Sequence, residues 1–384
     1  MWLTLMLVTT SCSPGEDEQH ASAPVNDVTD SLVLESEVGH GPEPEAQFGY
    51  VLAARRSSAG RLYVLDAMSR RLAAFDSTGR HVRDLARNGE GPGEFRRAAA
   101  LALLQDMPVV WDQQLWRITR FDADGQVLGM HSAPPRGETG WLPSVASAGD
   151  TWLYLDQEIE SPADSGADVH GGIVRAVARL LKWKPGADWE PVAEFPGMEA
   201  ALDPVAGTLS VAPFPARPLW APAADSSFWY ADSRAYRVRR ITFQGDTIAS
   251  IDVPREGPPV SDAAWSDFVG GRQRELSTPA ARERARLPRP ATLPVLQHLL
   301  SSAQGDLWLQ LQPPDTAHDA EWHVYAPDGN PRYVLRIPRD VQVLSVDAGH
   351  IVTLAEDSLG VQIVRTYRLD GPWHQLRGVP SVRR

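Results

Sequence analysis

The sequence has 384 residues, of which 43% are hydrophobic and 22% charged, with 13 tryptophans and one cysteine. This composition is too apolar for a disordered chain, and the length suits one large all-β domain or two smaller ones. Nine of the twelve net negative charges lie in residues 13–47, which contain no Lys or Arg, so the rest of the chain carries a net charge of −3. A near-neutral domain offers no long-range field that would attract polyanions, so a general nucleic-acid role, which normally needs a basic face, is not expected. A single Cys excludes a disulfide-stapled module.

The chain begins with an apolar stretch, residues 1–8, which is followed by Thr-Thr-Ser and Cys12. A small residue before a lone Cys, between an apolar segment and a polar one, resembles a bacterial lipoprotein signal, in which the Cys is lipidated after cleavage. An ordinary secretory signal with an incidental Cys is the alternative. We therefore predict a signal segment at 1–12, lipidation of Cys12, and an acidic disordered tether at 13–30. The protein is then expected in the cell envelope, facing the periplasm or the cell exterior, with membrane contact through the lipid only.

Past residue 30, a unit of strand, turn, strand, glycine turn and strand repeats along the chain. The clearest copies run over residues 60–85, 107–128 and 225–248, and weaker copies begin near residues 150, 305 and 349. A polar insertion at about 157–173 interrupts the copy that begins near 150. The turn glycines are Gly79, Gly125, Gly186, Gly245, Gly329 and Gly371. Their basal spacing of just over forty residues is the length of a four-stranded propeller blade, so six copies predict six blades.

The repeated pattern Tyr-Val-x-Asp-x-x-x-x-Arg-Leu/Ile-x-x-Phe-Asp-x-x-Gly resembles the NHL repeat, and the chain resembles the bacterial six-bladed β-propeller lipoproteins that contain it. The resemblance implies an all-β, six-bladed propeller with four-stranded blades at residues 31–376, followed by a tail at 377–384. In that family the N-terminal strand closes the ring by pairing into the last blade. Residues 32–38 are suited to that role and would leave no open sheet edge.

The glycine-rich segment at 88–95 could be mistaken for a phosphate-binding loop, but no Lys or Ser/Thr follows at the required offsets. Similar segments occur at 39–48 and 255–260. All three stand after an expected outer strand and before the next inner strand, so we interpret them as linkers between blades, with Gly91 and Gly93 at positive φ. Glu94 is then a turn acid on the rim.

Two further residue types recur at one position of the repeat. Aspartates end the second strand of a blade, where a carboxylate can cap a turn by accepting backbone N–H groups two residues on. Tryptophans lie in the middle of the same strands and are predicted to pack between neighbouring blades. The aspartates are Asp66, Asp112, Asp156 and Asp232, and the tryptophans are Trp111, Trp152, Trp229 and Trp308.

The sequence offers no catalytic constellation. The ten histidines show no metal-ligand spacing and there is no Gly-x-Ser-x-Gly elbow, so we predict no catalytic residue and no cofactor. Because a propeller can assemble ligands from distant blades, a Ca²⁺ or Zn²⁺ ion in its channel stays an open alternative.

The segment 261–300 is predicted to be a partly helical insertion between blades, with a helix beginning after Ser261. Its candidate partner or ligand surface consists of Trp265, Arg282, Arg284, Arg286 and Arg289. The alternative is a surface flap that covers apolar strands.

These observations favour an exported, lipid-anchored, monomeric module that binds an envelope protein, a peptide or a ligand, without nucleic acid. Two alternatives are a channel-metal lyase or hydrolase of small or glycan-like substrates, and a sensor or scaffold subunit of an envelope complex.

Overall fold

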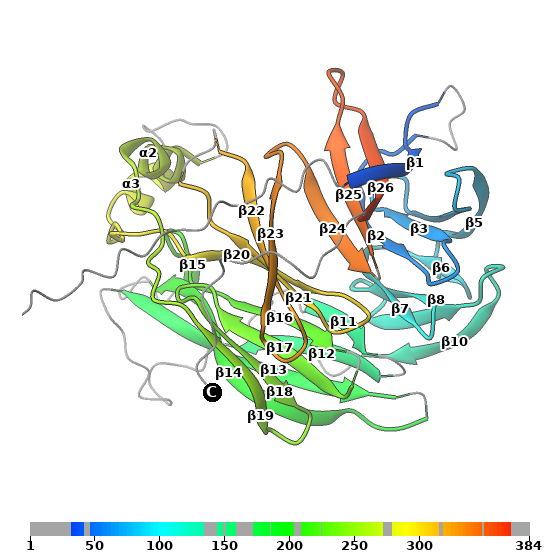
Figure 1. Cartoon of the computed structure of the whole chain (residues 1–384), viewed down its shortest axis with the longest axis horizontal. Coiled ribbons are helices and arrows are strands. Elements are labelled where there is room, and N and C mark those ends of the chain that lie inside the picture. The colour runs from blue at the N-terminus through cyan, green and yellow to red at the C-terminus, as the bar shows by residue number, and fades with distance from the viewer. Residues whose placement is uncertain are drawn as a thin grey trace, which may run out of the picture.

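The computed structural model describes residues 32–41, 47–133, 144–148, 151–158, 172–184, 186–202, 209–223, 225–271, 279–314, 318–347 and 349–369. Cys12, the predicted tether, Gly371 and the C-terminal tail lie outside the described residues. The described strands form six sheets, each built on four antiparallel strands, in a ring (Figure 1). Their innermost strands contact one another in cyclic order, from the first blade to the sixth and back to the first. The prediction of a six-bladed β-propeller is confirmed.

The first three blades run from the innermost strand outward. Blade 1 consists of β2 (Val51–Arg56), β3 (Leu62–Asp66), β4 (Arg71–Phe75) and β5 (His81–Asn88), with the short parallel β6 (Glu94–Phe95) at its edge. Blade 2 consists of β7 (Ala98–Leu104), β8 (Met107–Asp112), β9 (Arg117–Phe121) and β10 (Val127–Ser132). Blade 3 consists of β11 (Ser144–Ala148), β12 (Thr151–Glu158), β13 (Ile173–Trp183) and β14 (Glu190–Leu202), with β15 (Leu209–Val211) outside them.

The other three blades complete the ring. Blade 4 consists of β16 (Pro218–Ala223), β17 (Ser227–Asp232), β18 (Arg237–Thr242) and β19 (Thr247–Asp252). The helices α2 (Asp262–Gly270) and α3 (Pro279–Arg284) follow it in the chain. Blade 5 consists of β20 (Leu296–Ser301), β21 (Leu307–Leu311), β22 (Ala320–Tyr325) and β23 (Pro331–Ile337). Blade 6 consists of β24 (Gln342–Asp347), β25 (His350–Glu356), β26 (Gln362–Leu369) and β1 (Leu32–Val38).

The N-terminal strand closes the ring, as the sequence predicts. β1 pairs antiparallel with β26, with Leu32 opposite Leu369 and Val38 opposite Val364. Figure 1 shows the blue β1 lying against the orange-red β26, so the two ends of the propeller meet in one sheet. This pairing covers a sheet edge that would otherwise expose unpaired backbone groups.

The apolar core lies between neighbouring blades. All five residues of β3 are buried, because the second strand of a blade is packed on both faces. The four predicted tryptophans are each at most 2% exposed. Trp111 of blade 2 packs in one cluster with Trp152 of blade 3, and Trp308 packs among residues of blade 6. The predicted packing between blades is therefore confirmed.

The repeated aspartates cap turns, and some also bind the preceding linker. Asp66 accepts hydrogen bonds from the backbone N–H groups of Met68 and Ser69, at 3.0 and 3.2 Å, and from Gly49 and Tyr50, at 2.9 and 3.0 Å. Asp112 does the same with residues 96, 97, 114 and 115, and Asp232 accepts from residue 234. For Asp156 the prediction is wrong, because β12 continues to Glu158 and Asp156 pairs with Arg179 inside the sheet. The insertion in this blade lengthens the hairpin instead of leaving a turn at that point.

The glycine-rich segments are linkers between blades, since each described part stands between an outer strand and the next inner strand. Gly93 has a φ of 75°, as predicted, whereas Gly91 is not at positive φ, so that expectation is wrong. The carboxylate of Glu94 accepts a hydrogen bond from the Gly91 backbone N–H at 3.0 Å and pairs with Arg87 at 3.1 Å. The Gly91 hydrogen bond, together with Arg87, lowers the pKa of Glu94. Glu94 therefore stabilises the loop in which it lies by binding the backbone of Gly91.

Candidate functional site: the central channel

The central channel contains a cavity of about 750 Å³. All six inner strands contribute to its wall, mainly through their C-terminal parts. The lining combines small and aliphatic residues, among them Ala102, Val145, Ala146, Pro222 and Leu300, with a similar number of polar and charged residues. A cavity of this size that combines apolar surface with polar groups can accommodate a small molecule.

Serine hydroxyls in the wall of this cavity form hydrogen bonds between neighbouring inner strands. The hydroxyl of Ser345 donates to the carbonyl of Ala54 at 3.0 Å, which joins blades 6 and 1. Ser147 donates to Leu103 between blades 3 and 2 in the same way. These bonds satisfy carbonyl groups on the inner edge of the sheets, where no further strand is available.

Arg55 of β2 is one of the charged residues that line the cavity. Its Nη1 donates to the carbonyls of Ala54 and Leu344, both at 2.9 Å. Burial lowers the pKa of Arg55 to about 10, and among the described residues no carboxylate contributes to that pKa. A guanidinium at this pKa is still protonated at neutral pH, so Arg55 carries a positive charge to which no described carboxylate is closely paired.

A second arginine and a histidine lie elsewhere along the inner strands. Arg217, just before β16, donates to the carbonyl of Gln297 on β20, and burial lowers the pKa of its guanidinium. The side chain of His298 has solvent access, yet desolvation within the ring, followed by the charge of Arg217, lowers its pKa to about 4. His298 is therefore neutral at physiological pH, and the arginines supply the positive charge here.

The insertion that the sequence singles out forms a flap docked on the linker between blades 3 and 4. Ser261 caps α2 by accepting from the Ala264 N–H at 3.1 Å, which confirms the predicted helix start. Phe268 of α2 packs against Phe214 with a ring-centroid distance of 5.7 Å, and against Trp265 at 5.5 Å. Figure 1 shows the two helices together at one edge of the molecule.

Two of the four predicted flap arginines are structural. Arg284 donates to the carbonyl of Val269, and Arg289 pairs with Asp262, each at 2.8 Å. The guanidinium of Arg289 also lies 6.0 Å from the ring centroid of Trp265. Arg282 and Arg286 are exposed. The structure therefore divides the predicted surface between groups that hold the flap together and groups that point to solvent.

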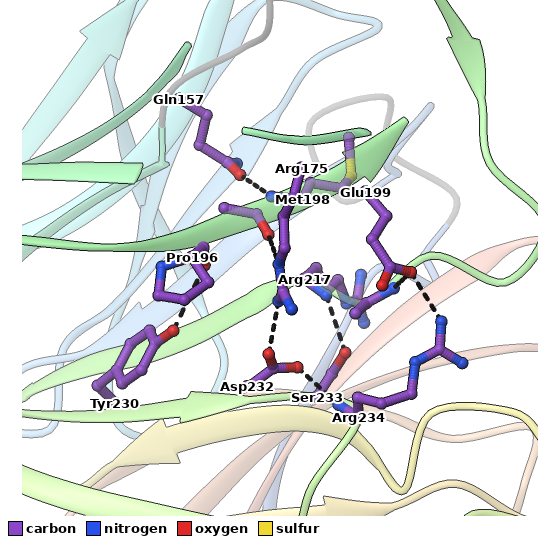
Figure 2. Close-up of polar contacts among 12 residues, drawn as sticks. Gln157, Arg175, Pro196, Met198, Glu199, Arg217, Tyr230, Asp232, Ser233 and Arg234 are labelled. Atoms are coloured by element: carbon purple, nitrogen blue, oxygen red, sulfur yellow. Dashed lines mark hydrogen bonds and ion pairs between the residues drawn. The ribbon is translucent and has the colours of Figure 1, made fainter. Parts of the chain in front are cut away.

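A polar cluster joins blades 3 and 4 beneath the flap (Figure 2). Arg175 of β13 pairs with Asp232 at the end of β17, at 2.5 Å, and Arg234 pairs with Glu199 of β14 at 2.7 Å. The same Glu199 accepts from the Ala216 backbone N–H at 2.7 Å. In the figure these side chains point toward one another across the two blades.

This cluster borders a smaller cleft of about 400 Å³, lined by Arg175, Glu199, Arg234 and the flap residues 288–290. The arginines of this cleft have carboxylate partners in the chain, with Arg289 bound to Asp262. Their charges are thus used within the chain, by Arg175 and Arg234 to join blades 3 and 4 and by Arg289 to hold the flap together. By contrast, Arg55 in the channel has no such partner among the described residues.

Within the described ranges, no three His, Cys, Asp or Glu side chains are grouped so that they could hold a metal ion. No helix in these ranges is long and apolar enough to cross a membrane.

Comparison with known proteins agrees with the fold. A family model, DUF5128, described as a 6-bladed beta-propeller, matches residues 51–162. That stretch spans blades 1 and 2 and part of blade 3. No curated protein matches the chain.

Several solved structures are similar to this chain at low sequence identity. A Bacteroides fragilis protein described as exported is 10% identical, with a TM-score of 0.48, over 92% of this chain and 98% of that one. A streptogramin B lyase is 12% identical, with a TM-score of 0.44, over 89% and 99%. A virginiamycin B lyase from Staphylococcus aureus is 10% identical, with a TM-score of 0.43, over 87% and 98%.

Proposed function

We propose that this protein is an exported binding module of the cell envelope, anchored through lipidated Cys12, and that it holds a small ligand in its central channel. The apolar segment, small residues and lone Cys at the N-terminus support export and anchoring. The channel cavity supports ligand binding, and it is the observation that carries this proposal.

The channel is a better candidate than the flap, because arginines of the flap and of the cleft beneath it already bind groups of the chain itself. At the flap and the cleft beneath it, Arg234, Arg284 and Arg289 are bonded to groups of the chain itself. In the channel, six strands enclose a space of about 750 Å³, within the range of roughly 300–1,000 Å³ that small-molecule sites occupy. A ligand there would be held by a rigid wall of strands, which reduces the entropy lost on binding.

A channel-filling variant tests the proposal. Ala146 of β11 lines the cavity and is half-buried, so Ala146→Trp places an indole in the ligand space. The control is Leu359→Trp, at a loop position that is 85% exposed. The protein is released gently from the membranes of its own cells and its bound small molecules are measured by native mass spectrometry.

We expect a ligand on the parent protein and on Leu359→Trp, with little or none on Ala146→Trp. Equal occupancy in both variants would place the ligand outside the channel. A parent protein that carries no ligand, and that acquires none from a total small-molecule extract of the same cells, would also refute the proposal.

A further inference from the structure

The guanidinium of Arg55 has unused hydrogen-bond donors that face the channel. An arginine offers five N–H donors, and Arg55 uses only Nη1, for the carbonyls of Ala54 and Leu344. Within the part of the chain that the structure describes, Nε and Nη2 make no hydrogen bond, yet neither is among the buried polar atoms without a partner. Both nitrogens therefore have accessible surface, and Arg55 lines the cavity.

Arg55 also departs from the repeat at a defined position. It pairs with Tyr63, three residues before the end of β3. The residues three before the ends of β8, β17 and β21 pair with inner-strand residues that are all apolar, namely Ala102, Ala221 and Leu300. A charged residue in a place where these three blades have an apolar one is not required by the fold.

We propose that the channel ligand is an apolar molecule with a single carboxylate, and that this carboxylate binds Nε and Nη2 of Arg55 as a bidentate pair. The inference rests on the proposed channel function and names its ligand class. A carboxylate matches the two adjacent donors of a guanidinium edge. It also supplies the negative charge that the described residues around Arg55 lack.

The rest of the cavity favours a monoanion with an apolar body. About half of its lining residues are Ala, Val, Leu or Pro, and these would contact a hydrocarbon chain or ring. Two carboxylates, Asp106 and Asp347, also line the cavity, and Asp106 is held by the backbone N–H of Ser58 at 3.1 Å. These acids disfavour a second negative charge on the ligand.

The test uses a series of N-acylglycines, from acetyl to octanoyl, and the matching neutral glycinamides as probes. Isothermal titration calorimetry measures both sets on the purified parent protein. We expect at least one acid to bind, with affinity rising with acyl length, and to bind at least tenfold more tightly than its amide. Equal binding of acid and amide would overturn the carboxylate assignment, and so would the absence of binding by any acid.

Three variants test which arginine binds the carboxylate. Arg55→Gln is expected to remove the preference for the acid, and Arg55→Lys is expected to keep part of it. The matched control is Arg80→Gln, because Arg80 belongs to the same blade, is 82% exposed and does not line the cavity. We expect this control to retain at least tenfold preference. Retention of the preference in Arg55→Gln, or its loss in Arg80→Gln, would overturn the assignment to Arg55.

Two precautions keep the outcomes distinct. Because Arg55 also donates to Leu344, Arg55→Gln can weaken the ring, but the ratio of acid to amide affinity on the parent protein tests the ligand class without any variant. If a ligand is lost from Ala146→Trp while acids show no preference over amides, the channel function stands and the carboxylate inference fails.

Discussion

Replacing Asp66 by Ala is expected to destabilise the propeller by about 2–4 kcal/mol, because its carboxylate joins a turn to the linker that enters blade 1. Asp66 is fully buried and accepts four backbone N–H groups, from residues 49, 50, 68 and 69. Those four residues are exposed, so water can replace part of each bond. At about 0.5–1 kcal/mol for each hydrogen bond, the four together give the stated loss.

Urea-induced unfolding followed by tryptophan fluorescence measures this effect, with Asp124→Ala as the control. The side chain of Asp124 is 71% exposed, so its removal is expected to change stability by less than about 0.5 kcal/mol. The pH dependence gives a second check. Burial raises the pKa of Asp66, but hydrogen bonds from Ser69, Gly49 and Tyr50 outweigh it and lower the pKa below 3.8.

A carboxylate with a lowered pKa stabilises the fold above its unfolded pKa, and this contribution is lost as the pH falls below about 3.8. Asp66→Ala should therefore differ from the parent less at pH 3 than at pH 7. A variant that unfolds within about 1 kcal/mol of the parent, or that matches Asp124→Ala, would refute the role assigned to this carboxylate.

Three further predictions concern the linker, the channel and the N-terminus. Gly93→Ala is expected to lower the free energy of unfolding by about 1–2 kcal/mol, because Gly93 has positive φ and a Cβ there would lie 3.1 Å from Val127. Gly91→Ala should lower it clearly less, and equal urea midpoints for the two variants would contradict this prediction. Because the pKa of His298 is lowered to about 4 in the fold, the unfolded chain binds the proton first, and stability should fall as the pH drops from about 6.5 to about 4. The parent should lose more stability over this window than His298→Gln, and parallel stability curves for the two proteins would contradict this prediction. Cys12→Ser is expected to move the protein out of the membrane fraction and abolish lipid labelling, and an unchanged distribution would show that Cys12 is not the anchor.

The architecture can be predicted from the sequence because the same strand and turn signals recur six times. Gly79, Gly125, Gly186, Gly245 and Gly329 all have positive φ at the turn between the third and fourth strands, where a residue without a Cβ fits best. The errors occur where a blade departs from the repeat. Asp156 lies inside β12 because the insertion that follows extends the hairpin, which a pattern based on the other blades does not anticipate.

The candidate site is much less predictable from the sequence. The arginines of the flap suggest a binding surface in the sequence, but in the fold Arg284 binds a backbone carbonyl and Arg289 binds a carboxylate of the flap itself. Arg55 belongs to no motif. What distinguishes it is that no described carboxylate contributes to its pKa, and only the folded ring determines this. Its one sequence signal is comparative. The inner strands place a charge here at a position where three other blades have an apolar residue.

A crystal structure of the protein with the tightest-binding N-acylglycine tests the central claim most directly, since it places the ligand without relying on a variant. We predict electron density for the ligand in the central channel, with its carboxylate within hydrogen-bonding distance of Nε and Nη2 of Arg55 and its acyl chain along the wall that includes Ala146. Density for the ligand at the flap or on the outer strands, with an empty channel, would contradict the account.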